Sequence, residues 1–555
     1  MNWIKKYWIE ILVFSAIFGV LLNALAPVWT WMATDSDGAH YTMAAKYLTV
    51  AHHMSAPLYL LMGHLFLWLP VSTEAWRMGL MSVLGTMGSV VFIYLILRHL
   101  LKDNPKARLY AIISCLVFGG SALVISQSAI IETYTLSTMC GVGAYYFALK
   151  QKWIWASVML GVGLAIHPFL AFIVWAVLFV AFKELRDWRR HGLTIIFFSF
   201  YLYIPIVKLI GNDIGMWGNT TASGFFEGTA GMVTMLTGGL SVWDFPKRAI
   251  DTILILLVSF GFGFIPLVWH FIKTKMWKYH LLWLVLIPII YFATDMAAPT
   301  YVYMLVSIAF GSIAVGLGLS KLNIKWAWAT CLVAVVLLGV NGWYFDVDRL
   351  DPEMSAMKFY NDLDIIPDDD YFMGGGWTWA MVYVYNKEEG RNIIPISIDA
   401  LPSNEYLGIL DGLGVKYDKF LLPLDSDFSY ITIQGKLAQS IAELNEGVWI
   451  AKETKPEVYQ YVIEPAKGNE AYIGRWIGQE ITPEWKWKPS NPYLFISGAL
   501  EIKEWHHILW SNRNMLHIMV YGMLGYGVVW YLSQMWRKRR KEVKHESSSG
   551  NTLQE

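Results

Sequence analysis

Long apolar runs recur along the chain and are separated by short polar segments. A membrane-spanning helix needs about 20 mostly apolar residues. Runs that meet or approach this length cover residues 8–27, 78–98, 109–127, 133–149, 153–166, 168–182, 193–210, 250–271, 279–294, 301–319, 326–344 and 514–534. The pattern therefore predicts an α-helical polytopic membrane protein with about twelve spans.

The basic residues are distributed unevenly between alternate loops. With the N-terminus inside, the cytoplasmic short loops and the C-terminal tail hold 23 of the 43 Lys and Arg residues, and the outer short loops hold five. Such an excess marks the cytoplasmic side. We expect both termini in the cytoplasm, and the longer loops outside, on a cell membrane.

The polar segments divide the chain into four parts. Residues 345–513 carry 27 acidic against 15 basic residues and are long enough for a folded extracytoplasmic domain. Short strands are predicted in it at 371–373, 381–385 and 430–433, which favours a mixed α/β domain. The predicted parts are a transmembrane domain (1–344), this outer domain (345–513), a last transmembrane helix (514–534) and a basic, disordered cytoplasmic tail (535–555).

Composition agrees with a membrane protein. Hydrophobic residues make up 56% of the chain, charged residues 15%, and mean hydropathy is +0.42, against about 25% charged residues in soluble proteins. The net charge of zero gives no reason to expect a nucleic-acid partner. All three cysteines lie in apolar runs, which predicts packed thiols and no disulfide framework in the outer segment.

The ionisable residues gather at the predicted outer ends of the helices. The richest stretch follows the first span and contains Asp35, Asp37 and His40. A carboxylate partly removed from water can accept a proton from a hydroxyl nucleophile. An aspartate before a helical run is also a good helix N-cap, so both interpretations stay open here.

Further candidates come from separate outer segments. His52 and His53 could hold a phosphate or a metal, or could pack at the interface. Glu132 is costly at its depth unless it is used or paired. His167 precedes a proline that could simply end a helix, and Asp295 is another outer carboxylate. We expect these groups to converge on one face.

An ordered set of segments resembles a known group of enzymes. The chain is similar to the GT-C-fold membrane glycosyltransferases, and most of all to the bacterial family related to protein O-mannosyltransferases, long listed as a domain of unknown function. The similarity rests on Asp37, His52 with Pro57-Leu58-Tyr59, Ser126-Gln127 with Glu132 to Leu136, Gly163 to His167, Trp217-Gly218-Asn219 with Gly224-Phe225, and Asp295 with Tyr301. Two positions depart from the family pattern: His40 stands at its glutamate, and His53-Met54-Ser55 at its Pro-Pro-Gly.

The resemblance implies roles for these residues. Asp37 would be the base, with Asp35 able to share that role, and Glu132 would orient it or shape the sugar pocket together with His167. His52, His53, Lys46 and Arg77 would stabilise the leaving phosphate. The remaining pocket candidates are His40, Trp217, Asn219, Asp295 and Tyr301.

The implied substrates are a polyprenyl-phosphate-linked sugar, with mannose as one candidate, and a hydroxyl of a protein or glycan acceptor, beside membrane lipid. Members of the group differ in metal dependence, so a divalent cation on Asp35, Asp37 and His40 stays open, and no other cofactor is expected. A polysaccharide polymerase or ligase would use similar chemistry. A transporter or lipid flippase would need ionisable residues in the middle of its helices, which this chain nearly lacks, and a sensor would leave the outer carboxylates unexplained.

Overall fold

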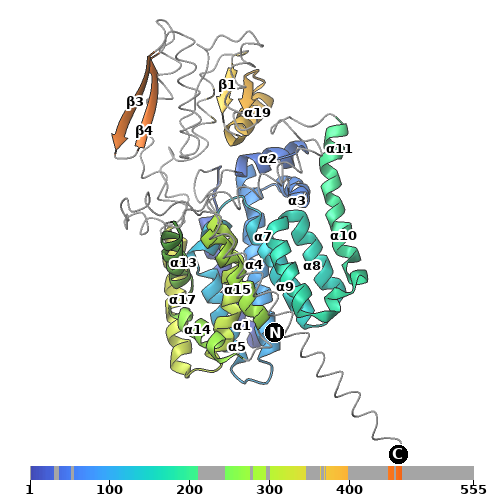
Figure 1. Ribbon diagram of the computed structural model, residues 1–555, viewed down its shortest axis with the longest axis vertical. Coiled ribbons are helices and arrows are strands. Elements are labelled where there is room, and N and C mark those ends of the chain that lie inside the picture. The colour runs from blue at the N-terminus through green and yellow to red at the C-terminus, as the bar shows by residue number, and fades with distance from the viewer. Residues whose placement is uncertain are drawn as a thin grey trace, which may run out of the picture.

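The computed structural model of the protein describes residues 2–29, 37–51, 56–210, 244–274, 279–294, 300–344, 360, 363, 368, 371–374, 376–397, 448–455 and 458–464. Most of these residues form a bundle of roughly aligned helices (Figure 1). Above one end of the bundle lie two short helices and a small unit of strands and one helix. The first part corresponds to the predicted membrane domain.

Among the described residues, five helical segments are long and apolar enough to cross a membrane: Lys5–Ala24, Glu74–Leu100, Arg189–Val207, Thr252–Lys273 and Ile324–Trp343. The first, second and fifth segments lie in α1 (Asn2–Ala24), α4 (Glu74–Leu100) and α17 (Ile324–Tyr344). The third runs from η3 (Trp188–His191) through α10 (Gly192–Phe198) and η4 (Ser199–Leu202) to α11 (Tyr203–Leu209). The fourth runs from α13 (Asp244–Phe260) through η5 (Gly261–Gly263) to α14 (Phe264–Lys273). A sixth candidate is the pair α5 (Ala107–Gly119) and α6 (Ala122–Ser128), which is bent by 63°.

Other apolar helices are shorter than a full span. They are α3 (Pro57–Leu67), α7 (Tyr134–Leu149), α8 (Trp153–Ile166), α9 (Pro168–Ala181), α15 (Tyr279–Thr294) and α16 (Met304–Leu319). Short 3₁₀ turns, η2 (Lys183–Arg186) and η7 (Thr300–Tyr303), precede η3 and α16 respectively. The described residues thus confirm a multi-spanning helical protein but not the count of twelve, and the predicted span 514–534 lies outside them.

The bend between α5 and α6 follows from the local sequence. Gly119 and Gly120 end α5, and Ser121 takes an extended conformation before α6 begins. The carbonyl of Gly120 accepts a hydrogen bond of 2.7 Å from the Asn341 side chain of α17. A side-chain partner for this carbonyl lets the helix break inside the protein without leaving the oxygen unsatisfied.

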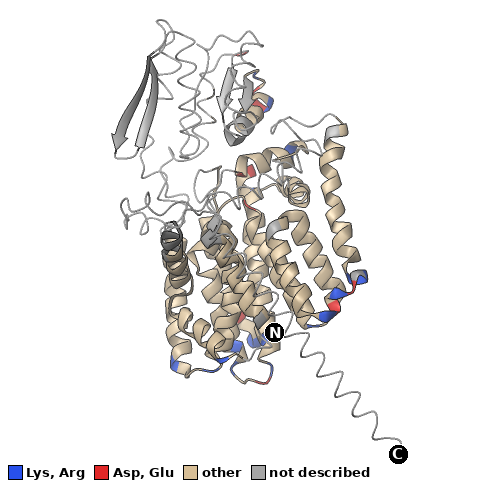
Figure 2. Ribbon diagram, in the orientation of Figure 1, with Lys and Arg blue, Asp and Glu red and all other residues tan. Residues whose placement is uncertain are grey.

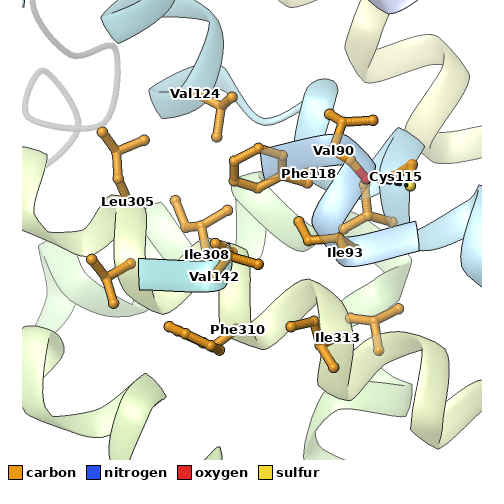
Figure 3. Close-up of a cluster of buried hydrophobic side chains, with 14 of the residues drawn as sticks. Val90, Ile93, Cys115, Phe118, Val124, Val142, Leu305, Ile308, Phe310 and Ile313 are labelled. Carbon is orange, nitrogen blue, oxygen red and sulfur yellow. Dashed lines mark hydrogen bonds between the residues drawn. The ribbon is translucent and has the colours of Figure 1, made fainter. Parts of the chain in front are cut away.

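Helix α16 lies at the centre of the bundle, and all its residues are buried. Side chains such as Ile308 and Ile313 meet Val90 and Ile93 of α4 and Phe118 of α5 in the main hydrophobic cluster (Figure 3). Glycines let the backbones approach closely here, as is common between membrane helices. A Cβ atom at Gly318 would lie 1.9 Å from the Pro266 carbonyl oxygen.

The outer part contains a parallel βαβ unit. Strand β1 (Tyr371–Gly374) pairs with β2 (Ile394–Ser397), with Tyr371 opposite Ile394, and α19 (Gly376–Glu389) connects them. Strands β3 (Val448–Lys455) and β4 (Val458–Glu464) form a separate antiparallel pair. The predicted strand at 371–373 is confirmed. The predicted strand at 430–433 lies outside the described residues, and so does much of the predicted α/β domain over 345–513.

The prediction of a strand at 381–385 was wrong, because this segment is part of α19. Its alternating Tyr and Val residues suggested a strand, but Met381, Val382, Val384 and Tyr385 are all buried. Burial at these positions follows the spacing of one helix face. That face packs on α2 (Gly38–Tyr47), so tertiary contact overrides the local preference.

Most of the described basic residues lie at the end of the bundle away from the strands (Figure 2). They include Arg186, Arg189 and Arg190 in the turns after α9. This segregation is the one expected of the cytoplasmic side, and the assignment of sides stays a prediction.

Candidate functional site

Asp37 occupies the N-cap position of α2. Its carbonyl oxygen accepts the backbone N–H of Tyr41 at 2.8 Å, but its carboxylate makes no capping hydrogen bond to the helix. The Asp37 side chain is 34% exposed, and its Oδ1 lies 3.9 Å from Nδ1 of the buried His40. Asp37 therefore occupies the cap position of the helix, but its carboxylate does not cap the helix.

Glu132 lies in the turn between α6 and α7 and is only 2% exposed. Ser82 of α4 holds its backbone: the hydroxyl donates to the Glu132 carbonyl at 3.0 Å and is 3.2 Å from the Glu132 N–H, which donates to it. The Thr133 N–H donates to Oε2 of Glu132 at 3.3 Å. A carboxylate in this surrounding needs such partners, since burying an unsupported charge is costly.

Two tyrosines lie within electrostatic range of both Asp37 and Glu132. Tyr41 is buried, which raises the pKa of its phenol well above the usual value, and the charges of Asp37 and Glu132 raise it further. Tyr134, at the start of α7, is also within electrostatic range of both carboxylates. The structure therefore brings these acids, which are far apart in sequence, to one region.

His167 joins the same region from the junction of α8 and α9. As the N-cap of α9, its Nδ1 accepts the Leu170 N–H at 3.4 Å. Its ring centre lies 5.1 Å from that of Tyr134 and 5.8 Å from that of Tyr303 in η7, and the two tyrosine rings are 5.8 Å apart. Both roles considered for His167 are thus compatible: it caps a helix, and it lies beside the acids through Tyr134.

Sequence reasoning missed Tyr41 and Tyr303. Tyr41 stands four residues after Asp37, the spacing that places two residues on one helix face, so the helical pattern could have indicated it. Tyr303 follows the predicted candidate Tyr301 by two residues in η7. The backbone of Tyr301 is described, and its side chain lies outside the described part.

Lys46 and Arg77 are engaged elsewhere. Lys46 lies near the end of α2, about 14 Å from Asp37 at 1.5 Å per residue. Its Nζ lies 3.0 Å from Oε1 of Glu74, and it pairs also with Glu388 of α19. Arg77 donates to the carbonyls that close the α3–α4 loop, those of Leu67 at 2.6 Å, Leu69 at 2.9 Å and Thr73 at 3.2 Å. These contacts tie α2, α4 and α19 together through Lys46 and close the α3–α4 loop through Arg77.

The remaining predicted site residues lie outside the described part of the chain: Asp35, His52, His53, Trp217, Asn219 and Asp295. Within the described residues, no group of three or more His, Cys, Asp or Glu side chains could hold a metal ion. Asp35 is not among the described residues, so a divalent cation on Asp35, Asp37 and His40 stays a prediction.

The chain has a GT-C-like fold and resembles the membrane glycosyltransferases that share this fold, as the sequence predicted. Residues 37–198 match the family described as the N-terminal domain of protein O-mannosyl-transferase TMEM260. This stretch contains Asp37, Glu132 and His167, the described residues that converge.

The fold is similar to that of a solved protein, ArnT, in two states. ArnT from Cupriavidus metallidurans bound to undecaprenyl phosphate superposes with a TM-score of 0.50 at 10% identity, over 73% of this chain and 91% of that one. Its apo state gives 0.50 at 10% identity, over 70% and 90%. The oligosaccharyltransferase of Archaeoglobus fulgidus, tethered with an acceptor peptide, gives 0.44 at 12%, over 85% and 78%. A comparison with curated proteins found no match.

Proposed function

We propose that the protein transfers a sugar from a polyprenyl-phosphate donor to a hydroxyl of a protein or glycan acceptor at the outer membrane face. The family match to a protein O-mannosyl-transferase domain supports the reaction class, with mannose as the first sugar to test. The likeness in fold to ArnT, solved with undecaprenyl phosphate, supports a lipid-phosphate donor. A membrane-embedded bundle with its polar site at one end suits such an amphiphilic substrate.

The observation that carries the proposal is the packing of α2, which begins after Asp37, against the segment that holds Glu132: Tyr41 shares one buried cluster with Ile131 and Leu136, and it feels the charges of both carboxylates. One carboxylate is partly exposed at a helix start and the other is buried and held by backbone groups. Carboxylates in unlike surroundings can take unlike roles. Asp37 suits the role of base because the acceptor can reach it, and Glu132 suits a role in orienting the site.

The chemical step is a single displacement. Asp37 takes the proton of the acceptor hydroxyl while the hydroxyl oxygen forms a bond to the anomeric carbon of the donor. The bond between that carbon and the phosphate oxygen breaks, and its electron pair leaves with the polyprenyl phosphate. Attack opposite the leaving group inverts the anomeric centre.

Asp37→Asn tests this role. Loss of a positioned base typically costs about 10²- to 10⁴-fold in rate, so we expect transfer to fall by that factor in purified protein supplied with undecaprenyl-phosphate-linked mannose and other synthetic polyprenyl-phosphate sugars. Asp187→Asn is the matched control, because Asp187 caps the η3 turn and pairs with Arg190 at the other end of the bundle. Wild-type rates in Asp37→Asn would exclude Asp37 as the base.

The acceptor is identified by mass spectrometry of envelope proteins and glycans from cells with and without the gene, complemented with wild type or Asp37→Asn. A missing hexose on protein hydroxyls points to protein glycosylation. A shortened or unattached glycan points instead to the polymerase or ligase alternative.

A further inference from the structure

Lys46 connects three elements at the outer end of the bundle. It lies on the last turn of α2, and its ammonium pairs with Glu74 on the first turn of α4 and with Glu388 near the end of α19. All three side chains are roughly 70% buried, at 28%, 31% and 33% exposed respectively. One ammonium between two carboxylates is favourable, whereas its removal would leave two like charges close together.

We infer that Lys46 is a positioning residue: through Glu388 it locks the outer βαβ unit onto α2, and the locked helix holds Asp37 at the site. This inference rests on the proposed function in assigning a role to Asp37. It gives Lys46 a different task from the phosphate contact expected from sequence.

Aromatic contacts extend the lock around the ion pair. Tyr47, next to Lys46, meets Tyr383 of α19 edge to face at 5.7 Å. Tyr360 donates its hydroxyl to Oε2 of Glu388 at 2.9 Å and packs against Trp29 at 5.9 Å. Glu388 is therefore held from both sides, which lowers the entropy that the ion pair costs.

A buried apolar seam continues from the lock toward Asp37. Ala39, Met43 and Ala44 of α2 share one hydrophobic cluster with Met381 and Tyr385 of α19, among other residues. Helix α2 is only ten residues long, so it moves as a rigid rod. A displacement of α2 at its contact with α19 would therefore also displace the first residue of α2, next to Asp37.

The test uses amide hydrogen exchange of residues 38–47 in the full-length protein in detergent, which needs no substrate. We expect Lys46→Met and Glu388→Gln each to raise exchange by about 3- to 10-fold, the range for a shielded pair in a network. Lys46→Arg should retain most of the protection. Arg190→Gln is the matched control, because Arg190 pairs with Asp187 at 3.9 Å at the other end of the bundle and its substitution should leave exchange in α2 unchanged.

Transfer kinetics supply the second readout. Lys46→Met and Glu388→Gln should lower kcat by about 10-fold or more with little change in KM for the donor, because a misplaced base affects the chemical step. A phosphate-binding role for Lys46 predicts the opposite: a raised KM in Lys46→Met and wild-type kinetics in Glu388→Gln.

The two readouts separate the two proposals. Wild-type exchange in both variants overturns the lock whatever their activity. Raised exchange with unchanged kcat overturns the positioning of Asp37. If wild-type protein transfers no sugar to any acceptor, the proposed function fails, while the exchange result still decides whether Lys46 locks α2.

Discussion

Gly85 is a position where α4 approaches the backbone of α7 closely, near Glu132. A Cβ atom added there would lie 2.6 Å from the Leu136 nitrogen, 2.7 Å from the Thr135 carbonyl carbon and 2.9 Å from the Leu136 Cα. All three are backbone atoms, so no side chain can rotate away. Gly85→Ala therefore forces α7 away from α4 in the turn that follows Glu132.

The size of this shift follows from the contact distances. Ordinary contacts of a Cβ atom begin at 3.4 Å, so the backbone at Leu136 must retreat by about 0.8 Å. Overpacking of this kind typically costs about 1–3 kcal/mol. A misplacement of about 1 Å at a site can lower the rate by about 100-fold, so we expect a lower melting temperature and a rate reduced by about 10- to 100-fold.

The assay compares Gly85→Ala with Gly339→Ala in purified protein. Gly339 lies in α17 with nothing within 4 Å of an added Cβ atom, so its substitution tests helix propensity alone. Thermal unfolding in detergent and sugar transfer are measured for both. If Gly85→Ala unfolds at the wild-type temperature and transfers at the wild-type rate, the close approach of α4 and α7 does not position Glu132.

Two other predictions concern Ser82 and Lys46. Ser82→Ala leaves the buried N–H and carbonyl of Glu132 without this partner, so it should lower the stability measured by thermal unfolding by about 1–3 kcal/mol. The control is Ser320→Ala at a partly exposed helix end, which should cost less. Wild-type stability of Ser82→Ala would contradict this prediction. Desolvation lowers the pKa of Lys46, but hydrogen bonds to Glu388 and Glu74 outweigh this effect and hold its pKa above 10.5. Its stabilisation is therefore complete below pH 10.5 and lost as the pH rises through the folded-state pKa, so the melting-temperature gap between wild type and Lys46→Met should be constant at neutral pH and close only in strong alkali. A gap that closes near pH 7 would refute this pairing.

The sequence predicted the helices well because apolar runs in a membrane protein have one explanation. It predicted their number less well, because an apolar run does not show where the helix breaks: residues 109–127 read as one span but bend at Gly119 and Gly120. The run 381–385 was assigned to a strand because its burial depends on α2, which lies more than 330 residues earlier in the chain.

The candidate site could be predicted in part for a similar reason. Asp37, Glu132 and His167 carry functional groups that are costly to bury near a membrane, so each was visible alone. The partner of Lys46 was not visible, since Glu388 lies 342 residues away. The sequence alone therefore predicts a phosphate contact for Lys46, and the structure shows its ammonium paired with Glu74 and Glu388.

The breaks in the helices and the placement of the acids have a common cause. A regular helix uses its backbone N–H groups internally and offers none to a buried carboxylate. In the turn between α6 and α7, the Thr133 N–H is free to donate to the Glu132 carboxylate. The Ser82 hydroxyl accepts from the Glu132 N–H and donates to the Glu132 carbonyl. Irregular backbone at such depth is tolerated only where protein surrounds it. The short, broken helices that reduce the number of full spans are therefore the feature that allows an acid to be held inside the bundle, opposite the start of α2 where Asp37 lies.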